Sequence, residues 1–434
     1  MSKHKNFQQL KIDLQRHFGT SILEISDLKM FQDAVEYSTQ KSIGFNTLRR
    51  FFGFLPETSP SIKTINLLSK YLGYENYFSY LKYYSNDNEW TNWARIIKIE
   101  STSTIIKNDL NWLETQTNSP DFHLKLASII KSLTYKQQYG PINQLFDRRI
   151  INFSHDDQLK FAHNMCMLLG SISEEDLHDL IVNLIPNSIF RENIIHWYID
   201  YSKFNGYYGT LIESGITYAK IGSHERLFFE LILNYKDFLS QKGQMLHIPS
   251  NRIKTNFHPV LKGRLYGYNL IYFHQKNDKK NYEKTWKTTI KYMNSHKNEV
   301  FLFTIEVVPA LLLLKDFEKT NFLIEHYYEE ILTPTNWSGY HIHSNVLLAI
   351  TIEAILANKL KQANKTFSLI NISKLNTGYK EYNLIFYYLV KYHLALLNKE
   401  SKNVLNEIEE KYNSHVKSTG FTFFSKEFLV NYFS

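Results

Sequence analysis

Residues 45 to 50, Phe-Asn-Thr-Leu-Arg-Arg, combine side chains that can recognise the edges of DNA bases. Asn46 can form two hydrogen bonds with adenine, and Arg49 or Arg50 can do the same with N7 and O6 of guanine. Phe45 can contact the methyl group of thymine. On a helix these four side chains share one side. The segment is therefore expected to bind double-stranded DNA.

Five polar residues near this short helix suit contacts with the DNA backbone, because hydroxyl and ammonium groups bind phosphate and helix N-termini assist them. The other side of the helix carries Leu48, Phe51 and Phe52, which can turn toward a core. The alternative is a solvated polar face on a small helical domain that binds only protein. The expected phosphate contacts are Lys41, Ser42, Ser61, Lys63 and Thr64.

Three predicted helices position these side chains. The first starts at Ser26-Asp27, a capping and first-turn signal, and runs to about residue 38. The second begins near Gly44 or Phe45 and stops at Gly53, a C-terminal breaker. The third starts near Ser61 and places one apolar stripe toward the core. That stripe is expected to contain Ile62, Ile65, Leu68 and Leu72.

Composition bounds the fold class. A chain of 434 residues favours two or three domains, and 43% hydrophobic with 21% charged residues is typical of a globular protein. Tyr and Phe number 30 each, whereas Gly numbers 16 and Pro 9. So few turn-forming residues predict long helices with tight connections, and thus an all-α protein. The polar stretch 85 to 90 marks the expected boundary between domains 1–85 and 86–434.

A weak internal repeat occupies the C-terminal half. Apolar helices end in a turn containing Lys and Asn, a more polar helix follows, and the turns recur about every 40 residues. A helix pair repeated at this length indicates an α-solenoid, in which each pair buries its apolar face against its neighbours. The alternative is chance similarity among helices rich in Lys and Asn. The turns lie at Gln275-Lys276-Asn277, Lys315-Asp316, Asn358-Lys359 and Asn398-Lys399.

The segment of residues 26 to 75 resembles the helix-turn-helix of the phage-repressor (XRE-like) family. The similarity lies in Phe45 to Arg50, Pro60-Ser61, Thr64-Ile65 and the run from Leu68 to Gly73. In that family the middle helix contacts bases and the next helix packs behind it. Two departures are a longer turn before the middle helix and an extended loop after it.

The rest of the chain is similar in character to tetratricopeptide-like repeats, although their full consensus is not met. A repressor-type helix-turn-helix followed by such repeats resembles the peptide-sensing regulators of the Rgg and PlcR kind. The resemblance implies a homodimer formed by the repeats and a peptide or protein ligand bound on them. Only the architecture is carried over, because no peptide-binding motif matches residue by residue.

The distribution of charge favours a polyanion as partner of the N-terminal part. The formal net charge is +8, and residues 1 to 84 hold 11 Lys and Arg against 7 Asp and Glu. About half of the excess therefore sits in a fifth of the chain. A Lys-rich composition inherited from an A/T-rich genome is the alternative explanation.

Several functional classes are disfavoured. The single cysteine, Cys166, excludes an intramolecular disulfide and lies in an apolar stretch expected to be core. The run Val307 to Leu314 is too short to span a bilayer, and the N-terminus lacks an apolar signal core. No P-loop, dinucleotide turn, HExxH or GxSxG motif is present, and His341-X-His343 has no evident carboxylate or thiolate partner. A cytoplasmic protein without cofactor, metal or catalytic site is expected.

The leading interpretation is a cytoplasmic DNA-binding transcriptional regulator with a sensing and dimerising repeat region. Its rival is a helical-repeat interaction scaffold, such as a defence or stress adaptor, whose helix-turn-helix does not bind DNA. An enzyme hidden within the repeats is the third alternative.

Overall fold

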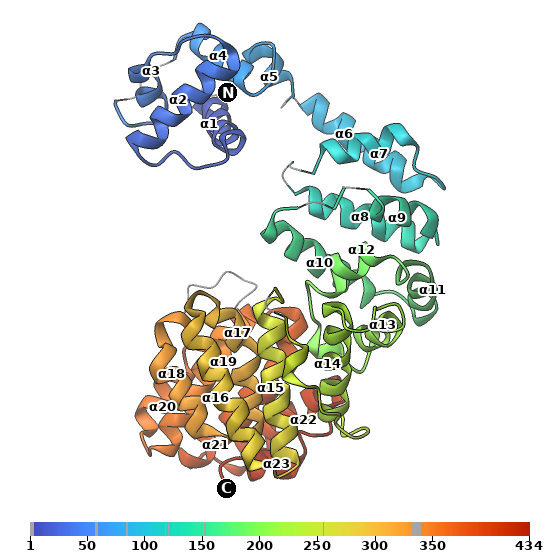
Figure 1. Cartoon of the computed structure of the whole chain (residues 1–434), viewed down its shortest axis with the longest axis vertical. Helices are drawn as coiled ribbons and strands as arrows, with labels where there is room; N and C mark the ends of the chain where they lie inside the picture. The colour runs from blue at the N-terminus through green and yellow to red at the C-terminus, as the bar shows by residue number, and fades with distance from the viewer. Residues whose placement is uncertain are drawn as a thin grey trace. The chain divides into compact units, whose positions relative to one another are not determined.

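In a computed structural model, helices are the regular secondary structure of the described parts of the chain (Figure 1). The structure describes residues 4–56, 60–83, 86–117, 119, 121–148, 150–151, 153–254, 256–331 and 340–434. Helices make up 73% of the chain and no strand occurs in these ranges, so the all-α prediction is confirmed. The chain divides into two compact units, the N-terminal unit (Met1–Ser101) and the C-terminal unit (Thr102–Ser434).

The N-terminal unit has one hydrophobic core that includes Phe31 of its second helix. The rings of Phe18, Phe52 and Tyr71 meet the ring of Phe31 edge to face, with centroids 5.3 to 5.5 Å apart. This core joins helices that are too short to be stable alone. The helices are α1 (His4–Phe18), α2 (Ile25–Thr39), α3 (Phe45–Phe51), α4 (Ile62–Tyr71), α5 (Tyr77–Tyr83) and α6 (Asn86–Ser101). Helix α6 begins within the polar stretch at which the sequence predicted a domain boundary.

Helix boundaries in this unit lie close to the predicted ones, but the predicted cap Ser26 lies inside α2, which begins at Ile25 after the N-cap residue Glu24. Asp27 caps the start of α2, where its Oδ2 accepts the backbone N–H groups of Leu23 and Glu24 at 3.0 and 2.9 Å. Helix α3 starts after Gly44 and is followed by Gly53, which adopts the left-handed conformation with φ of +87°. The second helix is therefore confirmed at both ends.

One predicted core position on α4 is wrong. Ile65 and Leu68 are buried and Leu72 is half-buried against the core, but Ile62 is 64% exposed. Ile62 is the first residue of α4 and precedes the turn that reaches the core. Tyr71, which lies between the predicted positions, is buried instead.

The C-terminal unit consists of helices that pack in pairs, as the predicted repeat requires. Helices α15, α17, α19 and α21 are followed by their partners α16, α18, α20 and α22, and each packs on its partner. The pairing agrees with an α-solenoid, in which neighbouring pairs bury one another's apolar faces. The elements are α7 (Lys107–Thr115), α8 (Phe122–Tyr135), α9 (Tyr139–Phe146), α10 (His155–Leu169), α11 (Glu174–Leu184), α12 (Ser188–Phe190), the π-helix η1 (Arg191–Ile195), η2 (Tyr201–Lys203), α13 (Tyr207–Gly215), α14 (His224–Leu239), η3 (Ser250–Arg252), α15 (Pro259–Gln275), α16 (Lys279–Ser295), η4 (Lys297–Glu299), α17 (Val300–Leu314), α18 (Phe317–Ile331), α19 (Tyr340–Leu356), α20 (Leu360–Phe367), η5 (Ile372–Lys374), α21 (Thr377–Leu397), α22 (Lys402–Thr419) and α23 (Lys426–Val430).

The four predicted turns connect the helices of these pairs by the same geometry. Each contains one residue in the left-handed conformation, with φ between 54° and 57°. The next backbone N–H bonds the carbonyl five residues earlier, at 2.8 to 3.0 Å, which is the Schellman arrangement. The predicted repeat turns are confirmed. The left-handed residues are Asn277, Lys315, Asn358 and Lys399.

Two glycines of α15 allow α15 and α17 to approach closely. A Cβ atom on Gly263 would lie 2.1 Å from the carbonyl oxygen of Phe303, and one on Gly267 would lie 2.9 Å from that of Glu306. These contacts involve backbone atoms, which cannot rotate away as a side chain can. The helix pair therefore depends on glycine at these positions.

The repeats close on an earlier part of the same unit, because α21 packs against η2. Ser202 donates to the carbonyl of Gly378 at 3.0 Å and accepts the N–H of Glu381 at 3.1 Å. The C-terminal segment adds further bonds, among them those from the N–H of Phe423 to the carbonyl of Leu239 at 2.9 Å and from the Tyr432 hydroxyl to the carbonyl of Leu312 at 2.8 Å. The contacts from η2 through α13, α14, α15, α17, α19 and α21 thus form a closed ring.

Tyrosines and one buried ion pair lie at this closure. Arg264 donates to Glu306 at 2.5 Å, and the Tyr201 hydroxyl donates to the other carboxylate oxygen at 2.5 Å. The rings of Tyr379 and Tyr382 lie 4.9 and 5.5 Å from the ring of Tyr201. Burial raises the pKa of the Tyr201 hydroxyl well above its usual value. Tyr201 is therefore a neutral core residue that donates a hydrogen bond.

Two further expectations concern core and membrane. Cys166 is fully buried in α10, and burial raises the pKa of its thiol, so the predicted structural thiol is confirmed. Among the described helices, none combines the length and apolarity needed to cross a bilayer.

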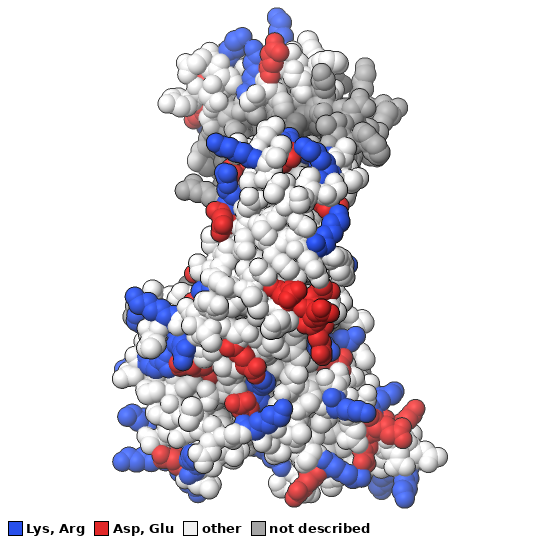
Figure 2. Space-filling view, turned by 90° about the vertical axis from the view of Figure 1, so that its right-hand side faces the viewer, with Lys and Arg blue, Asp and Glu red and all other residues white. Residues whose placement is uncertain are grey.

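Charge is distributed unevenly over the C-terminal unit. Figure 2 shows acidic side chains gathered on one face near its middle. Helix α11 begins with three consecutive acidic residues, whereas α16 carries five lysines and a single glutamate. The start of α11 is therefore acidic, whereas α16 is basic.

We predict that Gly263→Ala destabilises the C-terminal unit by about 3 kcal/mol, because α15 and α17 must separate to admit the methyl group. Gly140 provides a matched control within the same unit, since it is helical and a Cβ there meets nothing within 4 Å. Gly140→Ala should change stability by at most about 1 kcal/mol, and toward greater stability. Urea unfolding followed by circular dichroism measures both. Equal stabilities of the two variants would contradict the close packing of α15 on α17.

Candidate nucleic-acid interface

Helix α3 is held against the core by one side only. Leu48 is fully buried, Phe51 is 4% exposed, and Phe52 packs against the same core. The predicted inward side of the helix is confirmed. Because α3 has only seven residues, its position depends on this packing and on the segments that flank it.

The turn between α2 and α3 is fixed by two side chains of α2. The amide of Gln32 donates to the carbonyl of Ile43 at 2.6 Å, and the carboxylate of Glu36 accepts the N–H of Ile43 at 2.9 Å. The Gln32 amide also donates to Glu36 at 3.3 Å. Both backbone groups of Ile43 are thereby satisfied, which anchors the entry into α3. We call Gln32 and Glu36 the turn clamp.

Helix α4 starts next to Ser61, as the sequence predicted, and Ser61 caps it. The Ser61 hydroxyl accepts the backbone N–H of Thr64 at 3.1 Å, and the two hydroxyls lie 2.9 Å apart. Ser61 and Lys63 are exposed and Thr64 is half-buried. The first turn of α4 therefore presents polar groups beside a helix N-terminus, an arrangement suited to binding an anion.

The predicted base-contacting side of α3 is only partly exposed. Asn46 and Arg50 are exposed, whereas Phe45 is half-buried and packs against the core. Arg49 is also half-buried, with Nη1 3.4 Å from Oδ1 of Asn46, and its Nε is buried without a hydrogen-bond partner. Asn46 and Arg50 are thus the two side chains of α3 best placed to contact a ligand.

Several cations of the unit are unneutralised. Arg16 and Lys29 have acidic neighbours on their own helices, at 3.9 Å from Asp13 and 3.2 Å from Asp33. Lys41, Arg50 and Lys63 have no ion pair with any residue that the structure describes. Lys41 and Ser42 are exposed in the turn before α3. The charge excess predicted from the sequence is therefore accessible around α3 and α4.

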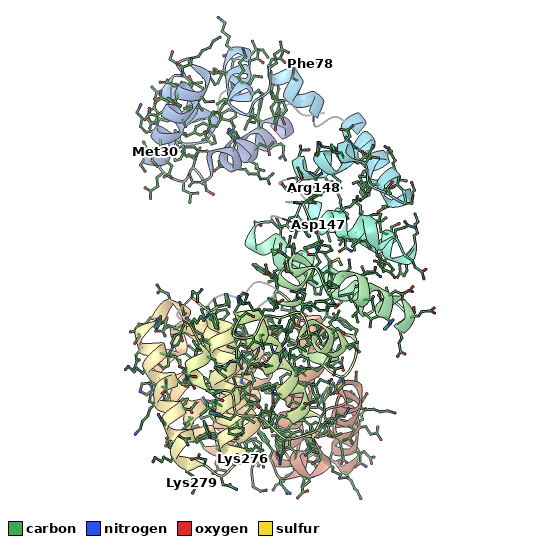
Figure 3. The ribbon with its side chains drawn as sticks, turned by 45° about the vertical axis from the view of Figure 1, so that its right-hand side comes forward. Met30, Phe78, Asp147, Arg148, Lys276 and Lys279 are labelled. Carbon is green, nitrogen blue, oxygen red and sulfur yellow. The ribbon has the colours of Figure 1, made fainter. Side chains whose placement is uncertain are left out.

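The N-terminal unit also exposes large apolar side chains that the sequence did not reveal. Met30 and Tyr37 of α2 are 56% and 83% exposed, and Phe78 of α5 is 76% exposed. Figure 3 labels Met30 and Phe78 at the surface of the unit. Met30 and Tyr37 are seven residues apart and lie on the same face of α2. A surface of this kind is compatible with a protein contact as well as with DNA.

No metal centre is formed by the described residues, since they contain no group of three His, Cys, Asp or Glu side chains able to hold an ion. His343 lies in α19 with its ring 5.7 Å from that of Tyr340, and burial lowers the pKa of its imidazole. The side chain of His341 lies outside the described residues.

Comparisons with known proteins give no relative: no protein-family model, no curated protein and no solved structure matches this chain. The family resemblances noted in the sequence therefore remain hypotheses that rest on the quoted residues.

Sequence reasoning missed the turn clamp. Its only signal was a glutamine and a glutamate four residues apart on α2, a spacing that places both on one face. That spacing does not reveal which backbone groups the two side chains satisfy, because Ile43 is eleven residues from Gln32 and reaches it only in the folded unit.

We predict that Gln32→Met destabilises the N-terminal unit by about 1 to 3 kcal/mol, because it leaves the carbonyl of Ile43 without its buried donor. Gln40 offers a matched control, since its amide donates to the carbonyl of Tyr37 at the same 2.6 Å but in an exposed position. Gln40→Met should cost less than about 0.5 kcal/mol, because water replaces the lost bond. Thermal unfolding measures the difference, and similar costs would show that the clamp does not hold the turn.

Proposed function

We propose that the protein is a DNA-binding transcriptional regulator whose helical repeats dimerise and sense a peptide or protein ligand. The observation that carries this proposal is the pair Asn46 and Arg50, which are exposed together on a short helix fixed by its core contacts and by the turn clamp. A rigid support matters because base recognition requires donors and acceptors at defined positions.

The side chains around α3 supply the two kinds of contact that DNA recognition combines. Arg50 offers the paired donors that match guanine N7 and O6, and Asn46 offers the donor and acceptor that match adenine. Lys41, Lys63 and the capped first turn of α4 offer positive charge and N–H groups to phosphates. Arg49 and Phe45 are half-buried, so they contribute more to the shape and orientation of α3 than to contacts with bases.

Dimerisation follows from the size of α3. A helix of seven residues covers only a few base pairs, and repressor-type modules gain affinity by binding two half-sites about one DNA turn apart. The C-terminal unit provides the larger surface on which two copies can associate.

A peptide or protein ligand of the repeats would act by favouring one arrangement of the two DNA-binding modules over another, since equal affinity for both shifts nothing. Several tyrosines of the C-terminal unit cannot line such a site, because they lie in its interior. Tyr201, Tyr235 and Tyr382 are buried within the closed ring, so the ligand surface we propose lies on the remaining faces of the unit.

We predict that Arg50→Ala weakens binding to the preferred duplex by about 1 to 3 kcal/mol and relaxes preference at one base position. Arg49→Ala should do so only if that half-buried side chain reaches a base. Lys63→Ala should instead weaken binding to all sequences alike. The slope of log affinity against log salt should become shallower by the amount expected for about one phosphate contact. Lys70→Ala, at the other end of α4, serves as the control.

The measurement is selection of bound sequences from random duplex DNA, followed by fluorescence anisotropy with each variant. If the full-length protein shows no salt-sensitive binding to any duplex, the proposal fails. The scaffold alternative, which the exposed Met30, Tyr37 and Phe78 favour, would then replace it.

We predict that the full-length protein is a dimer at micromolar concentration, as measured by light scattering. A fragment ending at Ser101, the limit of the N-terminal unit, should be monomeric because the proposed interface lies on the repeats. A strictly monomeric full-length protein would contradict the dimeric part of the proposal.

A further inference from the structure

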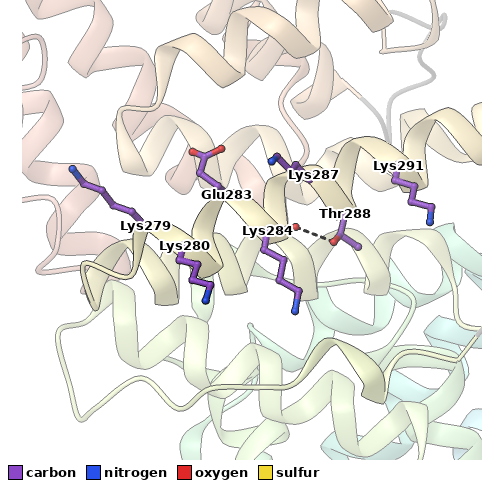
Figure 4. Close-up of a pocket in the computed structure, with 7 residues that line it drawn as sticks. All are labelled: Lys279, Lys280, Glu283, Lys284, Lys287, Thr288 and Lys291. Atoms are coloured by element: carbon purple, nitrogen blue, oxygen red, sulfur yellow. Dashed lines mark hydrogen bonds between the residues drawn. The ribbon is translucent and has the colours of Figure 1, made fainter.

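Helix α16 carries a row of exposed lysines that the function proposed above does not use. Lys280, Lys284, Lys287 and Lys291 are exposed and line a shallow open hollow on the surface of the C-terminal unit (Figure 4). Positions i, i+4, i+7 and i+11 lie on one face of a helix and span about 16 Å. We call these four residues the lysine stripe.

The orientation of the stripe is fixed by the buried side of the same helix. Tyr282, Thr285, Thr289 and Met293 are buried, and the Tyr282 hydroxyl donates to Asp316 at 2.5 Å. The stripe therefore points away from the array. Lys276 and Lys279, labelled in Figure 3, add positive charge at the N-terminal end of α16.

The acidic residues nearest in sequence to the stripe are engaged elsewhere. Asp278 caps α16, where Oδ1 accepts the N–H of Asn281 at 3.0 Å and Oδ2 accepts its side-chain amide at 2.7 Å. Glu283 accepts from Lys319 of the next helix pair at 2.9 Å. None of the four stripe lysines has an ion pair with a residue that the structure describes. Their ammonium groups are therefore exposed to solvent and have no ion-pair partner among the described residues.

A row of four exposed lysines occurs on α16 and not on the partner helices of the other three pairs, of which α20 carries two lysines and no acidic residue. Helix α18, at the equivalent position in the next pair, contains one lysine and four glutamates. Helix α22 contains three lysines and three glutamates. A general excess of lysine in the chain would have raised the charge of these helices as well. Lysines at i and i+4 repel one another, so their accumulation on one helix opposes its stability.

The chemistry of the stripe fits phosphate better than a protein or a membrane surface. Protein interfaces are poor in lysine and rely on large apolar or aromatic anchors, and α16 has no exposed large apolar side chain. A helix that lies in a membrane surface also requires such side chains. Lysine binds phosphate as a point charge and lacks the paired donors by which arginine recognises guanine.

We propose that the lysine stripe binds the phosphate backbone of duplex DNA without sequence preference. Duplex DNA carries one negative charge per about 1.7 Å of its axis, so a row of about 16 Å can meet several phosphates at once. The site adds affinity and salt dependence, whereas base preference would arise at α3. It does not depend on base recognition by Asn46 or Arg50.

The test replaces the four stripe lysines by glutamine in the full-length protein, as K280Q/K284Q/K287Q/K291Q. Binding to a random-sequence duplex is measured by anisotropy from about 50 to about 300 mM salt. The plot of log affinity against log salt should become shallower by about 3 to 4, since each phosphate contact contributes about 0.9. Affinity at the lowest salt should fall by a factor of ten or more.

The matched control is K399Q/K402Q/K411Q/K417Q, which removes the same formal charge from four exposed lysines at and in α22. Glutamine suits position 399, because Gln137 and Gln241 adopt the same left-handed conformation. The control should retain the wild-type slope, and circular dichroism verifies that both variants are folded. Equal effects of the two variants would show that DNA binding responds only to the net charge of the protein, and would overturn the proposal.

Two more measurements separate this proposal from its rivals. The Arg50→Ala variant is assayed in parallel. If the stripe variant has a shallower slope of log affinity against log salt and Arg50→Ala has no effect, the result supports the stripe and contradicts the function proposed for α3. Wild-type protein that binds vesicles of anionic lipid but no duplex would overturn the DNA assignment. A stripe variant that binds DNA normally but no longer self-associates would also overturn it. That result would indicate that the stripe binds an acidic face of a second copy of the protein, such as that of α11.

Discussion

A buried ion pair, Arg264 with Glu306, joins α15 to α17 inside the closed ring of the C-terminal unit. Taking both charges out of water is costly, and removing either partner would leave the other charge buried and unpaired. The Tyr201 hydroxyl satisfies the second carboxylate oxygen of Glu306, while Arg264 Nε is buried without a partner. Because Tyr201 lies in η2 and contacts the rings of Tyr379 and Tyr382, the pair links α15 and α17 to the start and the end of the ring.

Closure changes what a helical array can do. An open solenoid presents a continuous inner surface, but here aromatic side chains from η2, α14 and α21 fill the interior, and the C-terminal segment packs on α14 and α17. Close contact between α15 and α17 leaves no room for a methyl group at Gly263. Such packing favours a rigid body. Binding is then left to the outer helices, where α16 and α18 differ sharply in charge.

In the N-terminal unit, packing against neighbouring elements likewise fixes the position of a short helix. Helix α3 has too few residues to be stable alone, and its buried side, the turn clamp and the cap of α4 hold it in place. This support leaves the side chains of Asn46 and Arg50 exposed, with Oδ1 of Asn46 3.4 Å from Nη1 of Arg49. It also holds the side chains of Phe45 and Arg49 partly within the core. A residue type that suits base recognition is therefore not by itself evidence that the side chain can reach a base.

The sequence by itself determined the features that depend on local physics: the helical class, the ends of α3, the cap at Ser61 and the four repeat turns. Those signals arise from backbone conformation and helical periodicity within a few residues. Tertiary structure alone decided the exposure of Ile62, the turn clamp and the closure of the ring through Ser202 and Gly378. Each of these depends on which surface a side chain meets after the chain has folded. Partners some 180 residues apart, such as Ser202 and Glu381, leave no periodic trace in the sequence.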